Sequence, residues 1–254
     1  MAERERIIRL VREGRITPEE AALLLDALAE IEAAPGAPLA HLDGLPGLRW
    51  LKVQLDSEDL EVHLDRRLQR PRVEGDVVVQ EQAPDLVLSR GTGSRRRGST
   101  QFLGLNLNWD FDFSTGRDPV VYLPEGWGLE VELASGDLEV SGLPFVRGRV
   151  TGGDAKLLEV HGVDLVVASG DLEAQLVLTQ GEHRLEVTRG DAEIRFRNSS
   201  VQVVGQLSSG DLEARGTFIQ EKHKVSGTVG EGKARLRLKV VSGDLTLEDE
   251  HVRA

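Results

Sequence analysis

A short motif, Ser-Gly-Asp followed by alternating apolar and polar residues, recurs through the second half of the chain. Self-similarity at a fixed period is the sequence signature of repeat architectures. Its glycines lie 17, 17, 20, 20, 17 and 16 residues apart when a degenerate copy at Ser226-Gly227 is counted. Weaker echoes stand upstream at Ser57-Glu58-Asp59-Leu60 and Glu74-Gly75-Asp76-Val77. The clear copies place their corners at Gly136-Asp137, Gly153-Asp154, Gly170-Asp171, Gly190-Asp191, Gly210-Asp211 and Gly243-Asp244.

Each copy indicates a turn followed by a strand. Glycine adopts the left-handed or bridging backbone of a tight corner, and aspartate accepts a hydrogen bond from a nearby main-chain N–H. The next residues alternate with the period of a half-buried strand, so Leu138 and Val140 are expected to point inward and Glu139 outward. A second apolar run precedes each corner.

One repeat unit orders up to twenty residues but buries only about half a dozen side chains, too few to offset its loss of conformational entropy. Stacking lets each unit share hydrogen bonds and buried faces with two neighbours. The repeat therefore predicts a mainly β fold, a single-stranded β-solenoid (β-helix-like) with two or three strands per turn. A β-sandwich of repeated hairpins is the alternative.

Stacking would bring the corner aspartates to about the inter-strand distance of 4.8 Å. Their repulsion in water is about 1 kcal/mol per neighbouring pair. A hydrogen bond from a backbone N–H to a charged acceptor contributes about 1.5–3 kcal/mol, so a structural role for these aspartates is favoured. Calcium-binding aspartate ladders need a nine-residue glycine-rich period, and the six histidines form no paired motif. No metal, cofactor or catalytic residue is predicted.

The first 34 residues predict a small α-helical hairpin. Gly14 ends the first helix, and Thr17-Pro18-Glu19-Glu20 has the capping residues of a second one. Residues 35–47 are expected to be a linker, and 48–254 the repeat domain, with a mobile loop near 91–100. The hairpin either packs on its own body or serves oligomerisation or docking. The candidate docking residues are Ile7, Leu10, Val11, Leu23, Leu24 and Leu28.

Charge and composition restrict the partners. The net charge of −12 repels phosphate backbones and anionic lipid heads, so nucleic acid is not expected and membrane association is not indicated. Neither a secretory signal nor an apolar run long enough to span a bilayer is evident, which predicts a cytoplasmic location. The charged end, Glu248-Asp249-Glu250-His251-Val252-Arg253, is expected to form a terminal rung that opposes end-to-end growth.

At these residues the chain resembles the bacterial β-strand-repeat “putative adhesin” domains of unknown function. Their hallmark is a run of degenerate Ser-Gly-Asp-Leu strands after a segment like Tyr122-Leu123-Pro124-Glu125-Gly126. The segment Gly14-Arg15-Ile16-Thr17-Pro18-Glu19-Glu20-Ala21 is similar to the SHOCT-like modules that precede such domains. The resemblance implies a link to cell-envelope stress and defines no catalytic residues.

These observations favour a non-catalytic scaffold or sensor-type interaction protein, whose rigid β body carries a helical module that oligomerises or docks on a protein partner. Two alternatives remain open at this point. One is a polymerising cytoskeletal solenoid similar to bactofilins. The other is a carbohydrate-active β-helix enzyme, since exposed carboxylates from adjacent rungs could form a catalytic pair.

Overall fold

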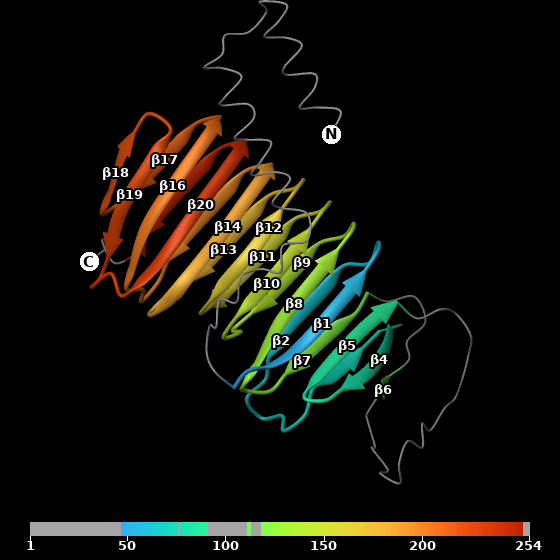
Figure 1. Cartoon of the computed structure of the whole chain (residues 1–254). Helices are drawn as coiled ribbons and strands as arrows, with labels where there is room; N and C mark the ends of the chain where they lie inside the picture. The colour runs from blue at the N-terminus through green and yellow to red at the C-terminus, as the bar shows by residue number, and fades with distance from the viewer. Residues whose placement is uncertain (1–46, 76, 91–110, 113–117, 251–254) are drawn as a thin grey trace, which may run out of the picture. The chain divides into compact units, whose positions relative to one another are not determined.

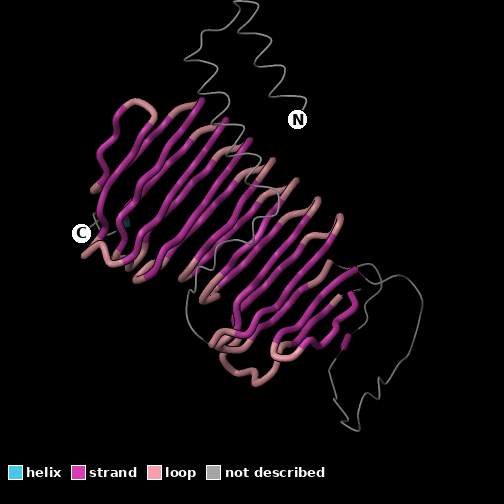
Figure 2. Tube along the Cα trace, viewed as in Figure 1, coloured by secondary structure: helices cyan, strands magenta, loops and turns pink. Residues whose placement is uncertain are grey.

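The computed structural model describes residues 47–75, 77–90, 111–112 and 118–250, all within the predicted repeat domain. These residues form two facing β-sheets, one of 11 strands and one of 10, called sheet A and sheet B below. In Figures 1 and 2 the strands of each sheet run side by side along one stack. The predicted helical hairpin (1–34), the linker up to residue 46 and the loop near 91–100 lie outside the described residues and stay predictions.

The strands of sheet A, in spatial order, are β18 (Phe218–Glu221), β19 (Lys224–Val229), β16 (Val201–Ser209), β20 (Ala234–Ser242), β14 (Gly181–Arg189), β12 (Val163–Val167), β10 (Val146–Val150), β8 (Trp127–Leu133), β1 (Arg49–Leu55), β5 (Asp85–Arg90) and β4 (Val77–Gln82). Those of sheet B are β17 (Leu212–Arg215), β21 (Leu245–Asp249), β15 (Ala192–Phe196), β13 (Leu172–Leu176), β11 (Ala155–Val160), β9 (Leu138–Ser141), β2 (Leu60–Leu64), β7 (Val120–Leu123), β3 (Arg72–Glu74) and β6 (Phe111–Asp112).

One turn of the coil contains two strands, one from each sheet. The chain runs along β10, turns at the Gly153-Asp154 corner, returns along β11 and enters β12 of the next turn. Val146 of β10 pairs in parallel with Val163 of β12, 17 residues later, and the central strands of both sheets pair in the same way. Such parallel ladders are those of a solenoid rather than of stacked hairpins. The predicted β-solenoid is confirmed, with two strands per turn.

The core lies between the two sheets and follows the alternation predicted from the repeat. Leu138 and Val140 of β9 are buried, whereas Glu139 between them is partly exposed. Inward side chains of both sheets form one continuous hydrophobic cluster, rich in valine and leucine. Such branched side chains suit a pleated surface buried on one face. Leu212 and Ala214 are only partly buried, because their strand β17 is the last of sheet B.

The spatial order of the turns departs from their order in sequence near the C-terminal end. The last turn, β20–β21, is inserted between β14–β15 and β16–β17, and it pairs in parallel with both. The chain reaches this gap through residues 230–233, which pass from one side of β16 to the other. Ala234 N–H donates to the carbonyl of Ser200 at 2.8 Å, at the start of β16. We call this arrangement the tail clamp.

A matching arrangement closes the other end. The first turn, β1–β2, lies between β8–β9 on one side and β5 and β7 on the other. The segment from Leu123 to Gly126 joins β7 to β8 across the entry of β1, and Arg49 N–H donates to the carbonyl of Gly126 at 2.9 Å. The segment singled out by the family resemblance therefore makes this crossing. We call it the head clamp.

Two sequence-based expectations are wrong in detail. The charged stretch at the C-terminus was expected at a terminal rung, but its first residues belong to β21, which is interior. Ser226-Gly227 was interpreted as a degenerate corner, but both residues lie within β19, an antiparallel strand. The first error arises because consecutive repeats were assumed to be neighbours in space, and the second because Ser226-Gly227 falls at the spacing of the repeat.

Candidate functional site

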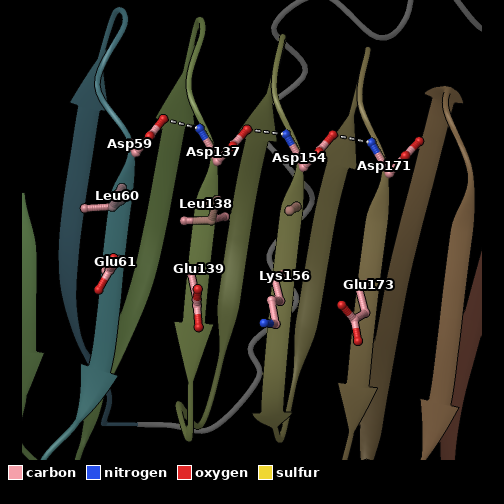
Figure 3. Close-up of a pocket in the computed structure, with 11 residues that line it drawn as sticks. Asp59, Leu60, Glu61, Asp137, Leu138, Glu139, Asp154, Lys156, Asp171 and Glu173 are labelled. Atoms are coloured by element: carbon pink, nitrogen blue, oxygen red, sulfur yellow. Dashed lines mark hydrogen bonds between the residues drawn. The ribbon is translucent and has the colours of Figure 1, made fainter. Parts of the chain in front are cut away.

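The corner aspartates form one continuous hydrogen-bonded column, which runs across sheet B where its strands begin. At each step, the main-chain N–H of one aspartate donates to Oδ1 of the preceding one at 2.8 Å. Figure 3 shows the first four members with their dashed hydrogen bonds. The column runs in the order Asp59, Asp137, Asp154, Asp171, Asp191, Asp244 and Asp211. We call it the aspartate ladder.

A second hydrogen bond strengthens each step in the opposite direction. Leu138 N–H donates to the carbonyl of Asp154, and Leu172 N–H to that of Asp191, both at 2.8 Å. Each aspartate inside the ladder therefore uses its N–H, its carbonyl and one carboxylate oxygen to bind the adjoining turns. Since hydrogen bonds to an ionised acceptor are the stronger ones, the ladder offsets the repulsion between neighbouring carboxylates.

The corner glycines are required by the same stacking. Gly153, Gly170 and Gly190 have φ of 124°, 141° and 136°, a region that residues with a Cβ rarely adopt. A Cβ at Gly170 would also collide with the carbonyl oxygen of Gly153 in the turn beneath it, and every later ladder corner has the equivalent collision. Each corner glycine thus lets one turn approach the next closely.

The first ladder corner lacks the glycine of the later ones. Asp59 opens the ladder, although Glu58 stands where the other corners have glycine. Glu58 is not among the positive-φ residues, and in the part of the chain that the structure describes no ladder member precedes Asp59. The upstream echo at 57–60 was therefore a true corner, recognisable by its aspartate and strand pattern. Asp76 of the second echo lies outside the described residues.

A shallow groove of about 420 Å³ runs beside the ladder (Figure 3). Its walls carry ladder carboxylates and a row of outward side chains in which Lys156 stands between Glu139 and Glu173. Over the described ranges, no three His, Cys, Asp or Glu side chains gather closely enough to hold a metal ion. The groove is acidic, and each ladder aspartate that lines it accepts a main-chain N–H from the next turn.

A second row of ionisable groups crosses the outer face of sheet A. Glu130, Arg147, Asp164 and Arg184 lie side by side in the parallel register, so their charges alternate. Nη2 of Arg147 lies 2.7 Å from Oε2 of Glu130. The guanidinium carbon of Arg147 lies 3.9 Å from the ring centroid of Trp50. Burial raises the pKa of Asp164, while Arg184 and Arg147 oppose that shift. Sequence reasoning overlooked this row, whose only signal is an aspartate inside the apolar segment 163–167.

His183 is the buried histidine among the described residues, with 4% of its surface exposed. Its Nδ1 accepts a hydrogen bond from Val163 N–H at 3.3 Å, and its Nε2 lies 2.9 Å from the carbonyl oxygen of Gln180. This geometry requires the neutral ring with its proton on Nε2. Burial lowers the pKa of His183, and the hydrogen bond to Gln180 opposes that shift.

All twelve predicted corner residues lie where the turns of the solenoid meet, and the ladder brings their aspartates together. The candidate docking residues Ile7, Leu10, Val11, Leu23, Leu24 and Leu28 fall outside the described residues. The part of the chain that the structure describes contains no helix long and apolar enough to cross a membrane.

The ladder and the paired parallel sheets define a β-solenoid whose turns are fastened at glycine-aspartate corners. The chain belongs to the Toastrack DUF4097 family, whose model matches residues 48–248. A SHOCT-like domain model matches residues 2–33.

The crystal structure of a “putative cell adhesion protein” from Clostridium sporogenes is similar over 83% of this chain and 96% of its own, with 14% sequence identity and a TM-score of 0.43. No curated protein matches the chain.

Proposed function

We propose that this protein is a non-catalytic scaffold or sensor-type interaction protein, in which the toastrack body is a rigid platform and the SHOCT-like segment oligomerises or docks on a protein partner. The observation that carries the proposal is the aspartate ladder. The most regularly repeated ionisable groups of the chain each bind a main-chain N–H of the next turn, up to the last member. The repeated aspartates therefore fasten each turn to the next, which supports a stiff body.

The proposal is tested by comparing the full chain with a chain that starts at Leu48. We expect light scattering to give a larger assembly for the full chain and a smaller one for the shortened chain, with the same β-sheet circular dichroism. A pull-down from the native organism, with and without residues 1–34, identifies the partner. Equal assembly masses together with identical pull-down partners would contradict a docking role for this segment.

The proposal extends to cell-envelope stress, which is the setting that the family resemblance implies. Cells that lack the protein are expected to become more sensitive to agents that damage the cell wall. Unchanged sensitivity would remove this part of the proposal while leaving the scaffold role intact.

We favour the scaffold over a bactofilin-like filament because of how the two ends are built. In sheet A the parallel ladder gives way beyond the clamps to antiparallel strands, β4 on β5 at the head and β18 on β19 at the tail. A filament that continued the coil would need a parallel turn at each end. Electron microscopy of the full chain distinguishes the two, and a glycan-cleavage screen tests the third alternative, a carbohydrate-active enzyme.

A further inference from the structure

Strand β18 is the outermost strand of sheet A at the tail end (Figure 1). Its outer edge has no neighbouring strand among the described residues, so alternate N–H and C=O groups on that edge lack a ladder partner. Ile219 of β18 is 66% exposed and Val204 of β16 is 63% exposed. Both lie in one row across the sheet, on either side of Ser226. Among the described residues the other exposed large hydrophobic is Val78, in the opposite edge strand β4.

The inner side of the β18–β19 hairpin is fixed to the body. The ring of Phe218 lies 5.7 Å from that of Phe196, which is fully buried. The Nε2 of Gln220 donates to the carbonyl of Leu212 in β17 at 2.7 Å. These contacts hold the strand in place from within and leave its edge and its outer face uncovered. The edge is thus presented in an extended conformation before any partner arrives, which reduces the entropy lost on binding.

We propose that β18 pairs in an antiparallel manner with β18 of a second copy, about a two-fold axis at Ile219. A self-paired antiparallel edge must place some residue opposite its own copy. An axis at Glu221 or Lys222 would oppose like charges, and an axis at Gln220 would place Ile219 beside a carboxylate. With the axis at Ile219, the two exposed isoleucines face each other and Thr217 lies opposite Glu221. On the outer face of the sheet this register places apolar beside apolar and polar beside polar residues, while Phe218 lies opposite Gln220 on the inner face.

The pairing joins the two 11-stranded sheets edge to edge. The contact is short, so it gives a weak, concentration-dependent dimer rather than an obligate one. It uses only the body of the protein, and it is therefore independent of the assembly proposed for residues 1–34.

The chain contains no cysteine, so single-cysteine variants of the full chain report this contact without background. In the paired register the two Ile219 Cα atoms are about 4.5–5.5 Å apart, within the range of a disulfide. The two Val204 Cα atoms would be about 24 Å apart, five inter-strand spacings. The variants to compare are Ile219→Cys, Val204→Cys as the equally exposed control, and Val78→Cys as a reporter of the opposite edge.

Under mild oxidation at micromolar protein we expect Ile219→Cys to form a disulfide dimer at least about tenfold faster than Val204→Cys, since paired cysteines meet at an effective concentration near the millimolar range. In cysteine-free protein, Ile219→Lys should lower the dimer fraction seen by sedimentation at equal concentration, whereas Val204→Lys should not. Equal cross-linking rates for the two cysteine variants, or rapid cross-linking of Val78→Cys alone, would overturn the proposal. An Ile219→Lys variant that sediments like the parent would overturn it as well.

Discussion

The main-chain N–H of Asp244 donates a 2.8 Å hydrogen bond to Oδ1 of Asp191, which lies 53 residues earlier in the chain. The corner that follows Asp191 in sequence is Asp211, and its N–H donates to Asp244 instead. The last turn, β20–β21, therefore lies between two turns that come earlier in the sequence. This one pair of residues defines the tail clamp.

The tail clamp predicts that the last turn is essential to the whole body. A chain that ends at Gly232 loses β20 and β21 and, with them, the buried side chains Ala234, Leu236, Leu238, Val240, Leu245 and Leu247. At about 2 kcal/mol for each of the five leucine and valine side chains, this burial contributes about 10 kcal/mol, which is comparable with the whole stability of an ordinary domain. We expect thermal unfolding by circular dichroism to lose its cooperative transition, while a chain ending at Glu250 keeps it. A cooperative transition within a few degrees of the parent in the shorter chain would contradict this.

Replacing a ladder aspartate is expected to lower the free energy of unfolding more in the middle of the ladder than at its end. Asp171→Ala removes the acceptor of Asp191 N–H, and we expect the free energy of unfolding in urea to fall by about 1.5–3 kcal/mol. Asp171→Asn keeps an acceptor oxygen and should lose less. Asp211→Ala is the matched control, because within the described ranges no further ladder N–H follows Asp211. Equal losses for Asp171→Ala and Asp211→Ala would show that the carboxylate acceptor contributes little.

The stability lost when a glycine is replaced by alanine is expected to depend on the atoms that lie beneath that glycine. Gly170→Ala would force a Cβ into the carbonyl of Gly153, so we expect a loss above about 4 kcal/mol or no soluble protein. Gly126 also has a positive φ, of 82°, but a Cβ there would meet nothing within 4 Å. Gly126→Ala should therefore lose only about 1–2 kcal/mol, the strain of the left-handed backbone. Similar melting temperatures for the two variants would contradict close stacking at Gly170.

His183 predicts a pH dependence. Burial lowers the pKa of His183 in the folded state, so the unfolded chain binds the proton more readily, around its ordinary pKa of about 6.5. The corresponding stability is present above pH 6.5 and is lost as the pH falls below it. We expect His183→Asn, which can still accept from Val163 N–H, to flatten the decline of unfolding free energy between pH 7 and pH 5. His161→Asn, at an exposed position, should leave the decline unchanged; an unaltered decline in His183→Asn would contradict the assignment.

The corner chemistry and the inward alternation could be predicted from the repeat because both depend on local residue types. Glycine at 136 and aspartate at 137 specify a turn, and Leu138 and Val140 specify the buried face of the strand that follows. The same rules predicted that the repeat units stack, since one turn cannot bury enough apolar surface by itself. Local chemistry thus determined the fold class.

The order of the turns could not be predicted, because the corners at Asp211 and Asp244 carry the same motif. Either corner could follow Asp191 in the ladder. The strands beside both corners carry similar leucine and valine side chains, so either turn could pack on the same neighbouring turn. What separates them is the crossing at residues 230–233, where Gly230 and Gly232 have positive φ. A glycine pair in a short loop is a common turn signal, so the sequence offered no means to distinguish this crossing from an ordinary hairpin.

The paired clamps limit how a protein of this kind can change in length. A copy of the repeat gained or lost between β10–β11 and β12–β13 would extend or shorten the ladder without touching either crossing. The same duplication at the first or last turn would disrupt a crossing of only a few residues. Growth of this architecture by duplication is therefore confined to its middle, and relatives of different lengths should differ there while both ends keep their number of strands.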